Sequence, residues 1–264
     1  SELHALVQRA LRNQREVLGR MIRGVLYEGK QNDDTGVVQE FSRLMGRCRQ
    51  EARTALGPKR LSGAVVFEVA AYPNEFLIDR YTLSDLGRVR DGLVVHAEGG
   101  HPFVSSEGVT SYVTNDSARS FMAEERDGRG PFYLELFLCG LLYCAVVDVD
   151  ASAPADPKAV SYLSLIRRVG TTIYAIGQAY AELGLEAELL TLTFRLLNTE
   201  GAFLTLPMQG DSATYRCFIP EVEVVKQRTA ADLISAPAPN AAKVVREMCE
   251  RFSFRSDEHV GLSQ

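Results

Sequence analysis

The hydrophobic pattern of residues 156–219 changes its period once, and this change constrains the fold more than any other feature of the sequence. Over residues 190–196, apolar residues alternate with polar ones, which is typical of a half-buried strand. Before that, apolar residues recur every three or four positions, as on the buried stripe of an α-helix: Val160, Leu163, Ile166, Val169, Ile173, Ile176, Tyr180 and Leu183. The change from one period to the other predicts a long helix that packs against a sheet.

Local signals predict where these elements begin and end. Asp156 and Pro157 are typical of a helix start, because an Asp carboxylate caps free N–H groups and Pro lacks an N–H that would be unpaired there. Gly184 is expected to end the helix in a left-handed conformation. Turn residues separate the strand at 190–196 from strands expected at 202–206 and 214–219. Because short connections favour antiparallel neighbours, we expect a three-strand meander on the helix.

The same signals predict the elements of the remaining chain. Helices are expected at residues 3–26, 37–56, 83–90, 230–234 and 241–252. Strands are expected at residues 64–70, 75–81, 92–97, 109–113, 132–139, 142–149 and 221–228. These elements indicate an α+β fold, with a mainly antiparallel sheet packed on a long central helix, an N-terminal helical hairpin and a C-terminal helix.

We expect three parts in this chain of 264 residues, which is long enough to bury a sizeable core. They are an N-terminal helical hairpin at 1–57, an α+β core domain at 61–221 and a C-terminal helical extension at 222–264. No apolar run reaches the roughly 18 to 20 residues that cross a bilayer, and no secretory signal is visible. The five cysteines form no CxxC pair, which favours reduced thiols. A cytoplasmic protein without a membrane segment is therefore expected.

The charge distribution is uneven although the net charge is only −5. Residues 1–60 contain 12 Lys and Arg against 7 Asp and Glu, so this part has a net charge of +5 and the remainder −10. The first helix gathers four arginines on the face opposite its apolar stripe: Arg9, Arg12, Arg20 and Arg23. A line of cations suits a nucleic-acid backbone or a protein partner. Nucleic acid is not favoured, because aromatic residues for base stacking are missing from this face.

Residues that could carry chemistry are few. His96, Glu98 and His101 form a cluster in a Gly-rich loop and are a candidate small-molecule site. Their spacing matches neither one helix face nor a zinc motif, so no metal is predicted. Phosphate-binding glycine loops and the GxSxG elbow are missing, and Asp148 and Asp150 alone make a weak magnesium site. We therefore predict no catalytic residue and no cofactor.

Four short sequences resemble those of known families. FYLELFLCG, AELGLEAE and FRLLNTEG, all within residues 132–201, are similar to an α/β region found after Schlafen-like (AlbA-type) DNA-binding domains in some bacterial proteins. That resemblance implies the neighbourhood of a nucleic-acid-binding domain. YAIGQAYAELGLEA, which precedes a strand, resembles a helix of flavin-binding nitroreductases. This second resemblance implies a bound flavin.

The favoured hypothesis is a non-catalytic interaction, sensing or regulatory protein of a bacterial-type cytosolic system, acting through partner binding or self-association. One alternative is a flavin-dependent, nitroreductase-like or other small-molecule enzyme with its site at His96, Glu98 and His101. A second alternative is nucleic-acid binding through the arginine face of the first helix.

Overall fold

The computed structural model describes residues 34–57, 63–95, 109–124, 131–147, 158–206 and 215–253, and the structural statements below concern these residues. The chain divides into two compact units, Ser1–Glu40 and Phe41–Gln264. The predicted helix at 3–26 lies outside the described residues. The segment 222–264, which the sequence assigned to a C-terminal extension, lies in the same unit as the core.

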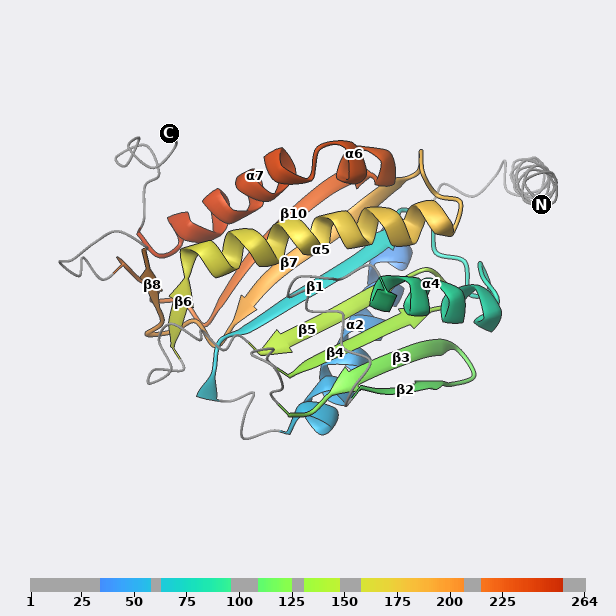
Figure 1. The fold of residues 1–264 in the computed structure, drawn as a ribbon, viewed down its shortest axis with the longest axis horizontal. Coiled ribbons are helices and arrows are strands. Elements are labelled where there is room, and N and C mark those ends of the chain that lie inside the picture. The colour runs from blue at the N-terminus through green and yellow to red at the C-terminus, as the bar shows by residue number, and fades with distance from the viewer. Residues whose placement is uncertain are drawn as a thin grey trace. The chain divides into compact units, whose positions relative to one another are not determined.

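The second unit is built on a seven-stranded antiparallel sheet with the strand order β10-β7-β1-β5-β4-β3-β2 (Figure 1). This sheet confirms the predicted α+β class with its mainly antiparallel sheet. Its strands are β1 (Val66–Pro73), β2 (Thr110–Val113), β3 (Ser117–Met122), β4 (Phe132–Phe137), β5 (Leu142–Val147), β7 (Leu189–Leu197) and β10 (Glu221–Thr229). A separate three-stranded sheet contains β6 (Ala159–Ser161), β8 (Phe203–Thr205) and β9 (Tyr215–Arg216).

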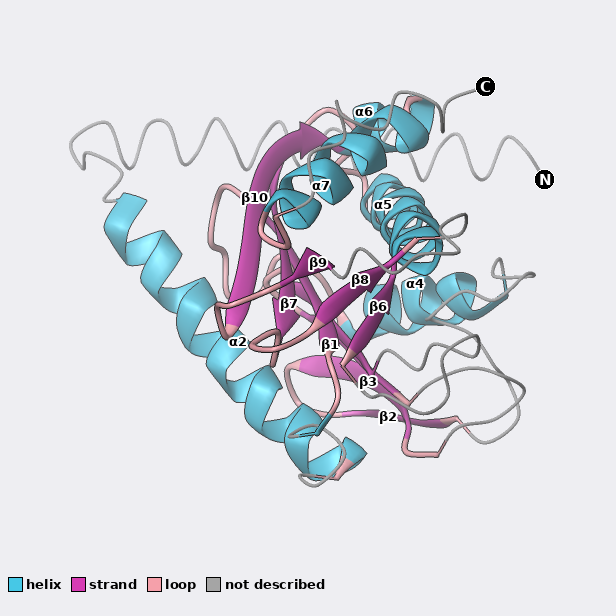
Figure 2. Cartoon of the chain, turned by 90° about the vertical axis from the view of Figure 1, so that its left-hand side faces the viewer, coloured by secondary structure: helices cyan, strands magenta, loops and turns pink. Residues whose placement is uncertain are grey.

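Helices cover both faces of the large sheet (Figures 1 and 2). One face carries α4 (Leu83–Val95), α5 (Tyr162–Glu182), α6 (Ala230–Ser235) and α7 (Pro237–Glu250). The opposite face carries residues 41–56 of α2 (Asp34–Leu56), which are the part of this helix that belongs to the second unit. None of the described helices is both long and apolar enough for a membrane span.

The hydrophobic core lies between α5 and the sheet. Alternate residues of each inner strand point into it, as Phe67, Val69 and Ala71 do from β1. Helix α5 contributes the later part of the predicted stripe, with Val169, Ile173 and Ile176 all buried. The prediction is wrong for Leu163, which is 52% exposed, and Leu165 is the buried residue near the start of the helix. The hydroxyl of Tyr180 reaches the carbonyl oxygens of Ala71 (2.5 Å) and Gly140 (2.7 Å), which ties the helix to the turn between β4 and β5. Gly140 has φ +87°, a conformation that favours glycine in this turn.

The predicted start of the long helix is wrong. Asp156 and Pro157 lie outside the described residues, and α5 begins at Tyr162 after the N-cap Ser161. The Ser161 hydroxyl accepts a hydrogen bond from the Ser164 amide at 3.3 Å. Val160 is fully buried, but in strand β6 and not on the helix. The expected end is confirmed, because α5 stops at Glu182 and Gly184 has φ +81°.

The predicted three-strand meander is also wrong. Strand β7 lies between β1 and β10, whereas β8 pairs with β6 in parallel and with β9 in antiparallel. Backbone bonds explain the change: the Phe203 amide donates to the Lys158 carbonyl (3.1 Å), and the Cys217 amide donates to the Ala202 carbonyl (2.8 Å). Strands β8 and β9 therefore lie outside the large sheet and join β6, which precedes α5, before the chain returns to the large sheet at β10.

Other local predictions are wrong because side-chain bonds or the continuation of a helix determine the backbone conformation of the segment. Residues 75–81 form turns, in which the Arg80 guanidinium binds Glu188 (2.7 Å) and Glu75 (3.1 Å). Residues 92–95 continue helix α4, so the strand predicted at 92–97 is wrong there. Strand β3 was not predicted. The helix predicted at 241–252 begins earlier, with Pro237 in its first turn.

Candidate functional site

The site residues predicted from the sequence all lie outside the described residues. This applies to the candidate small-molecule cluster of His96, Glu98 and His101. It also applies to the arginine face, which consists of Arg9, Arg12, Arg20 and Arg23. Both sites therefore stay predictions.

The cysteines are core residues of the second unit. All five are buried and reduced. Burial raises the pKa of Cys249 to about 12 and raises the pKa of Cys139 and Cys144 as well. These thiols are therefore protonated at neutral pH and are poor nucleophiles. Across the described ranges, no group of three His, Cys, Asp or Glu side chains could hold a metal ion.

A charged layer lies between residues 41–56 of α2 and the sheet. We define it by two buried carboxylates, Glu68 of β1 and Glu135 of β4, together with the charged side chains that bind them. These cations come from separate parts of the chain: Arg47 and Arg49 from α2, Arg119 from β3 and Arg195 from β7. Each strand contributes its charge at a position whose neighbours face the apolar core.

Glu68 is held by three donors. Arg49 forms a fork on it, with both nitrogen–oxygen distances at 2.7 Å, while the Tyr143 hydroxyl donates at 2.8 Å and the Arg195 guanidinium at 3.0 Å. Burial alone would raise the pKa of Glu68, but these bonds outweigh it and hold the pKa below its ordinary value. The carboxylate is therefore charged at neutral pH.

Glu135 has an equally complete set of donors. The Ser117 hydroxyl and the Arg119 Nε each donate at 2.6 Å, and the Tyr133 hydroxyl donates at 2.7 Å. The Cys48 thiol lies at 3.5 Å, and burial together with this carboxylate raises the pKa of Cys48. Both carboxylates are enclosed and saturated with donors, so the charged layer attaches α2 to the sheet.

The Arg47 side chain extends this layer toward β3 and β4. Its Nη1 binds Asp116 at 2.8 Å, and its guanidinium lies 4.7 Å from the centre of the Phe137 ring. A cation over an aromatic face is attracted by the ring quadrupole. Arg119 has a second acidic neighbour in Glu51 of α2, at 3.3 Å. The layer therefore joins α2 to four strands through directional contacts.

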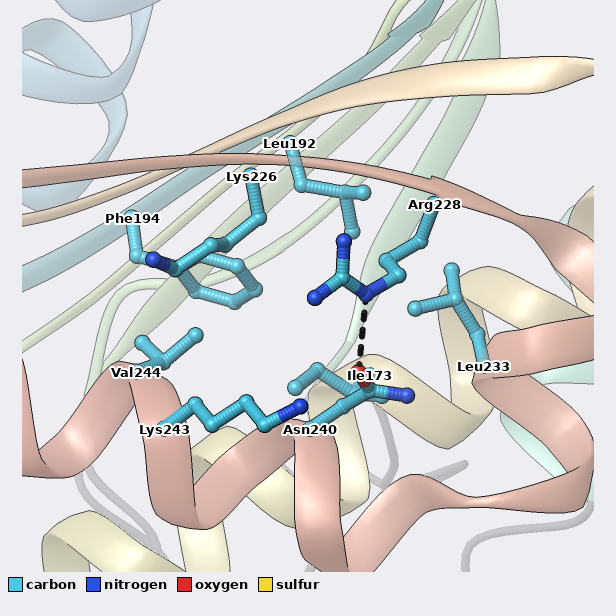
Figure 3. Close-up of a pocket in the computed structure, with 9 residues that line it drawn as sticks. All are labelled: Ile173, Leu192, Phe194, Lys226, Arg228, Leu233, Asn240, Lys243 and Val244. Carbon is cyan, nitrogen blue, oxygen red and sulfur yellow. Dashed lines mark hydrogen bonds between the residues drawn. The ribbon is translucent and has the colours of Figure 1, made fainter.

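A small basic crevice lies on the other face, between β10 and α7 (Figure 3). Its charged wall consists of Lys226, Arg228 and Lys243, and Ile173 and Leu192 lie at its apolar base. Arg228 points toward α7, where its Nε donates to the Asn240 side-chain oxygen at 3.1 Å (Figure 3). The enclosed space is about 10 Å³, close to the minimum that holds one water molecule. The crevice therefore presents charge at a surface and does not enclose a substrate.

Strand β10 forms one edge of the large sheet, and apolar side chains are exposed along it. Among the described residues its outer side meets no other strand. Phe218, just before the strand, is 76% exposed, and Ile219 and Val225 are also exposed. The opposite edge strand, β2, has only four residues against nine in β10. The β10 edge is thus the longer of the two pairing surfaces.

The structure reveals features that the sequence reading missed. Glu68, Glu135, Arg119 and Arg195 each stand as a single charge within an otherwise largely apolar or small-residue strand sequence. That pattern was the available signal for a buried polar layer, because an unpaired charge on a covered face is costly. A comparison of the chain with protein-family models, with curated proteins and with solved structures found no match.

Proposed function

We propose that the chain is a non-catalytic interaction protein of the sensing or regulatory kind, and that it pairs a strand of a partner, or of a second copy, with the edge of β10. The observation that carries this proposal is the nine-residue edge strand whose outer side is unpaired within the described residues. Such an edge presents backbone N–H and C=O groups that another strand can bind.

The exposed apolar side chains support binding at this edge. Phe218 and Ile219 lie at one end of β10 and Val225 lies at its middle. Covering them gives a hydrophobic contribution of about 25 cal/mol per Å² in addition to the backbone bonds. Apolar side chains on an edge strand favour association.

The charged layer supports the same role by making the platform rigid. Glu68 and Glu135 bind residues of α2 and of β3, β4 and β7. The sheet is therefore ordered before a partner binds. A preordered surface loses less conformational entropy on binding.

A matched pair of valines tests the proposal. Val225 of β10 and Val113 of β2 are 49% and 47% exposed, and each lies on an edge strand. Sedimentation equilibrium measures self-association, and selection from a displayed library of extended peptides measures partner binding. We expect Val225→Glu to weaken the observed association about tenfold or more and Val113→Glu to leave it unchanged.

Two results would contradict the proposal. One is a wild-type chain that stays monomeric and selects no peptide that distinguishes it from Val225→Glu. The other is an equal loss of association in both variants. Circular dichroism and thermal unfolding of the two variants check that both remain folded.

A further inference from the structure

We infer that the segment paired with β10 is an acidic extended peptide of another chain, with two carboxylates two residues apart facing Lys226, Arg228 and Lys243. This inference rests on the proposed function of the β10 edge. It names the chemistry of the partner, which edge pairing alone leaves open.

The cations gather on the side of β10 that faces α7. Along this side Val222 and Val224 are buried, and Lys226 and Arg228 follow at the same period of two. Helix α7 holds both cations in place: Lys226 binds Glu247 at 2.5 Å and Arg228 binds Asn240. Their charged ends therefore line the crevice in Figure 3.

Lys243 adds a third positive charge to the crevice. Its side chain is exposed, and no hydrogen bond or ion pair joins it to another described residue. Among the described residues, Lys226 has an ion pair with Glu247, whereas Arg228 and Lys243 have no carboxylate partner. The local excess of positive charge favours an anionic partner.

Strand geometry determines where the carboxylates of a partner would lie. Residues directly opposite each other in an antiparallel pair point to the same face, with Cβ atoms about 4.5–5.5 Å apart. Residues opposite Lys226 and Arg228 are therefore separated by one residue of the partner. Aspartate or glutamate at those two positions meets both cations, and Lys243 lies beside them.

The acidic residues of β10 do not change this conclusion, because they lie on its other face and are already paired. Arg195 binds Glu221 at 2.9 Å and also contacts Glu223. Arg49 lies 3.7 Å from Glu221. Within the part of the chain that the structure describes, the charge on β10 that lacks a counterion is therefore that of Arg228, on the α7 side.

A second copy of this chain does not supply the missing carboxylates through β10. Two copies paired edge to edge about a two-fold axis keep the same face on the same side of the joined sheet. On that face β10 presents Val222, Val224, Lys226 and Arg228, none of which is acidic. The observations thus favour a different chain as the occupant.

Synthetic peptides test this inference on the full chain. The first peptide is fluorescently labelled and has nine residues, the length of β10, in which aspartate alternates with threonine. In two control peptides, glutamine or lysine replaces every aspartate. Fluorescence anisotropy at low and high salt gives the affinities. We expect the aspartate peptide to bind best, to weaken with salt, and to lose about tenfold in Lys243→Glu. Arg246→Glu, an exposed change on α7 outside the crevice, is the matched control and should have little effect.

Several outcomes overturn the inference. They are absent binding of the aspartate peptide, equal binding of the glutamine peptide, and equal losses in Lys243→Glu and Arg246→Glu. Tighter binding of a single-stranded oligonucleotide with the same Lys243 dependence also overturns it, in favour of nucleic acid. If Val225→Glu still abolishes binding of the glutamine peptide or self-association, strand pairing at the β10 edge is retained and only the acidic nature of the partner is rejected. If Val225→Glu changes nothing, the proposed function itself falls.

Discussion

The same strands form both faces of the large sheet, but apolar packing dominates on one face and buried ion pairs distinguish the other. Toward α5, the strands present residues such as Phe67, Leu192 and Phe194, which pack in an apolar core. Toward residues 41–56 of α2, alternate positions present Glu68 and Glu135, bound by arginines from other elements. Apolar burial is strong but has no direction, whereas a forked ion pair requires one geometry. The apolar face thus stabilises the unit and the charged face specifies where α2 lies.

The largest expected effect is on the charged face. Glu135→Leu leaves Ser117, Arg119 and Tyr133 without their acceptor, and we expect the free energy of unfolding to fall by about 3–5 kcal/mol. Urea unfolding measures it. The double change Glu135→Leu with Arg119→Leu also removes the buried guanidinium that lost this acceptor, and it should recover part of the loss. A single-variant loss below about 1 kcal/mol would show that these groups behave like an exposed pair.

A smaller effect is expected on the apolar face, where α6 crosses α5. A Cβ at Gly177 would lie 2.8 Å from Cγ1 of Ile234 and 3.2 Å from the Ala230 carbonyl oxygen, so Gly177→Ala should cost about 1–3 kcal/mol. Gly170 is the control in the same helix, because its added Cβ would meet Ala241 at an ordinary 3.7 Å. Gly170→Ala should raise the unfolding free energy by up to about 1 kcal/mol. Equal shifts of the thermal midpoint in the two variants would contradict this packing.

The smallest expected effect is on the pH dependence of stability, through Glu68 on the charged face. The folded pKa of Glu68 lies below its unfolded value, so its contribution is complete above the unfolded pKa of about 4.3. The contribution is lost as the pH falls through the folded pKa, because the unfolded chain then binds more protons. Denaturant titrations between neutral and acid pH should show a shallower acid loss in Glu68→Gln than in wild type. A steeper loss of stability at acid pH in Glu68→Gln would contradict a folded pKa of Glu68 below its unfolded value.

Elements with strong local signals could be predicted from the sequence. The stripe of α5 from Val169 onward, the stop at Gly184 and the strand at 190–196 are confirmed, because periodicity and capping are local properties. The start at Asp156 failed because Ser161 caps the helix and residues 159–161 pair with β8 instead. Pairing of that kind depends on residues far along the chain and has no local signal.

The charged layer could not be assembled from local patterns for the same reason. Glu68 is 127 positions from Arg195 and 75 from Tyr143, and only the strand order brings them together. A single charge in an apolar strand, as in VFEVA or FYLELF, can face either solvent or a buried partner. The edge position of β10 likewise follows from the strand order, which depends on residues far apart in the chain.

Amide hydrogen exchange of the full chain, with and without the aspartate peptide, tests strand pairing at β10 most directly. Strand pairing should slow exchange at alternate amides of Glu221–Thr229, where the outward N–H groups would be bonded, and leave Thr110–Val113 unchanged. Protection confined to α7, or equal protection of both edge strands, would contradict binding by strand addition at this edge.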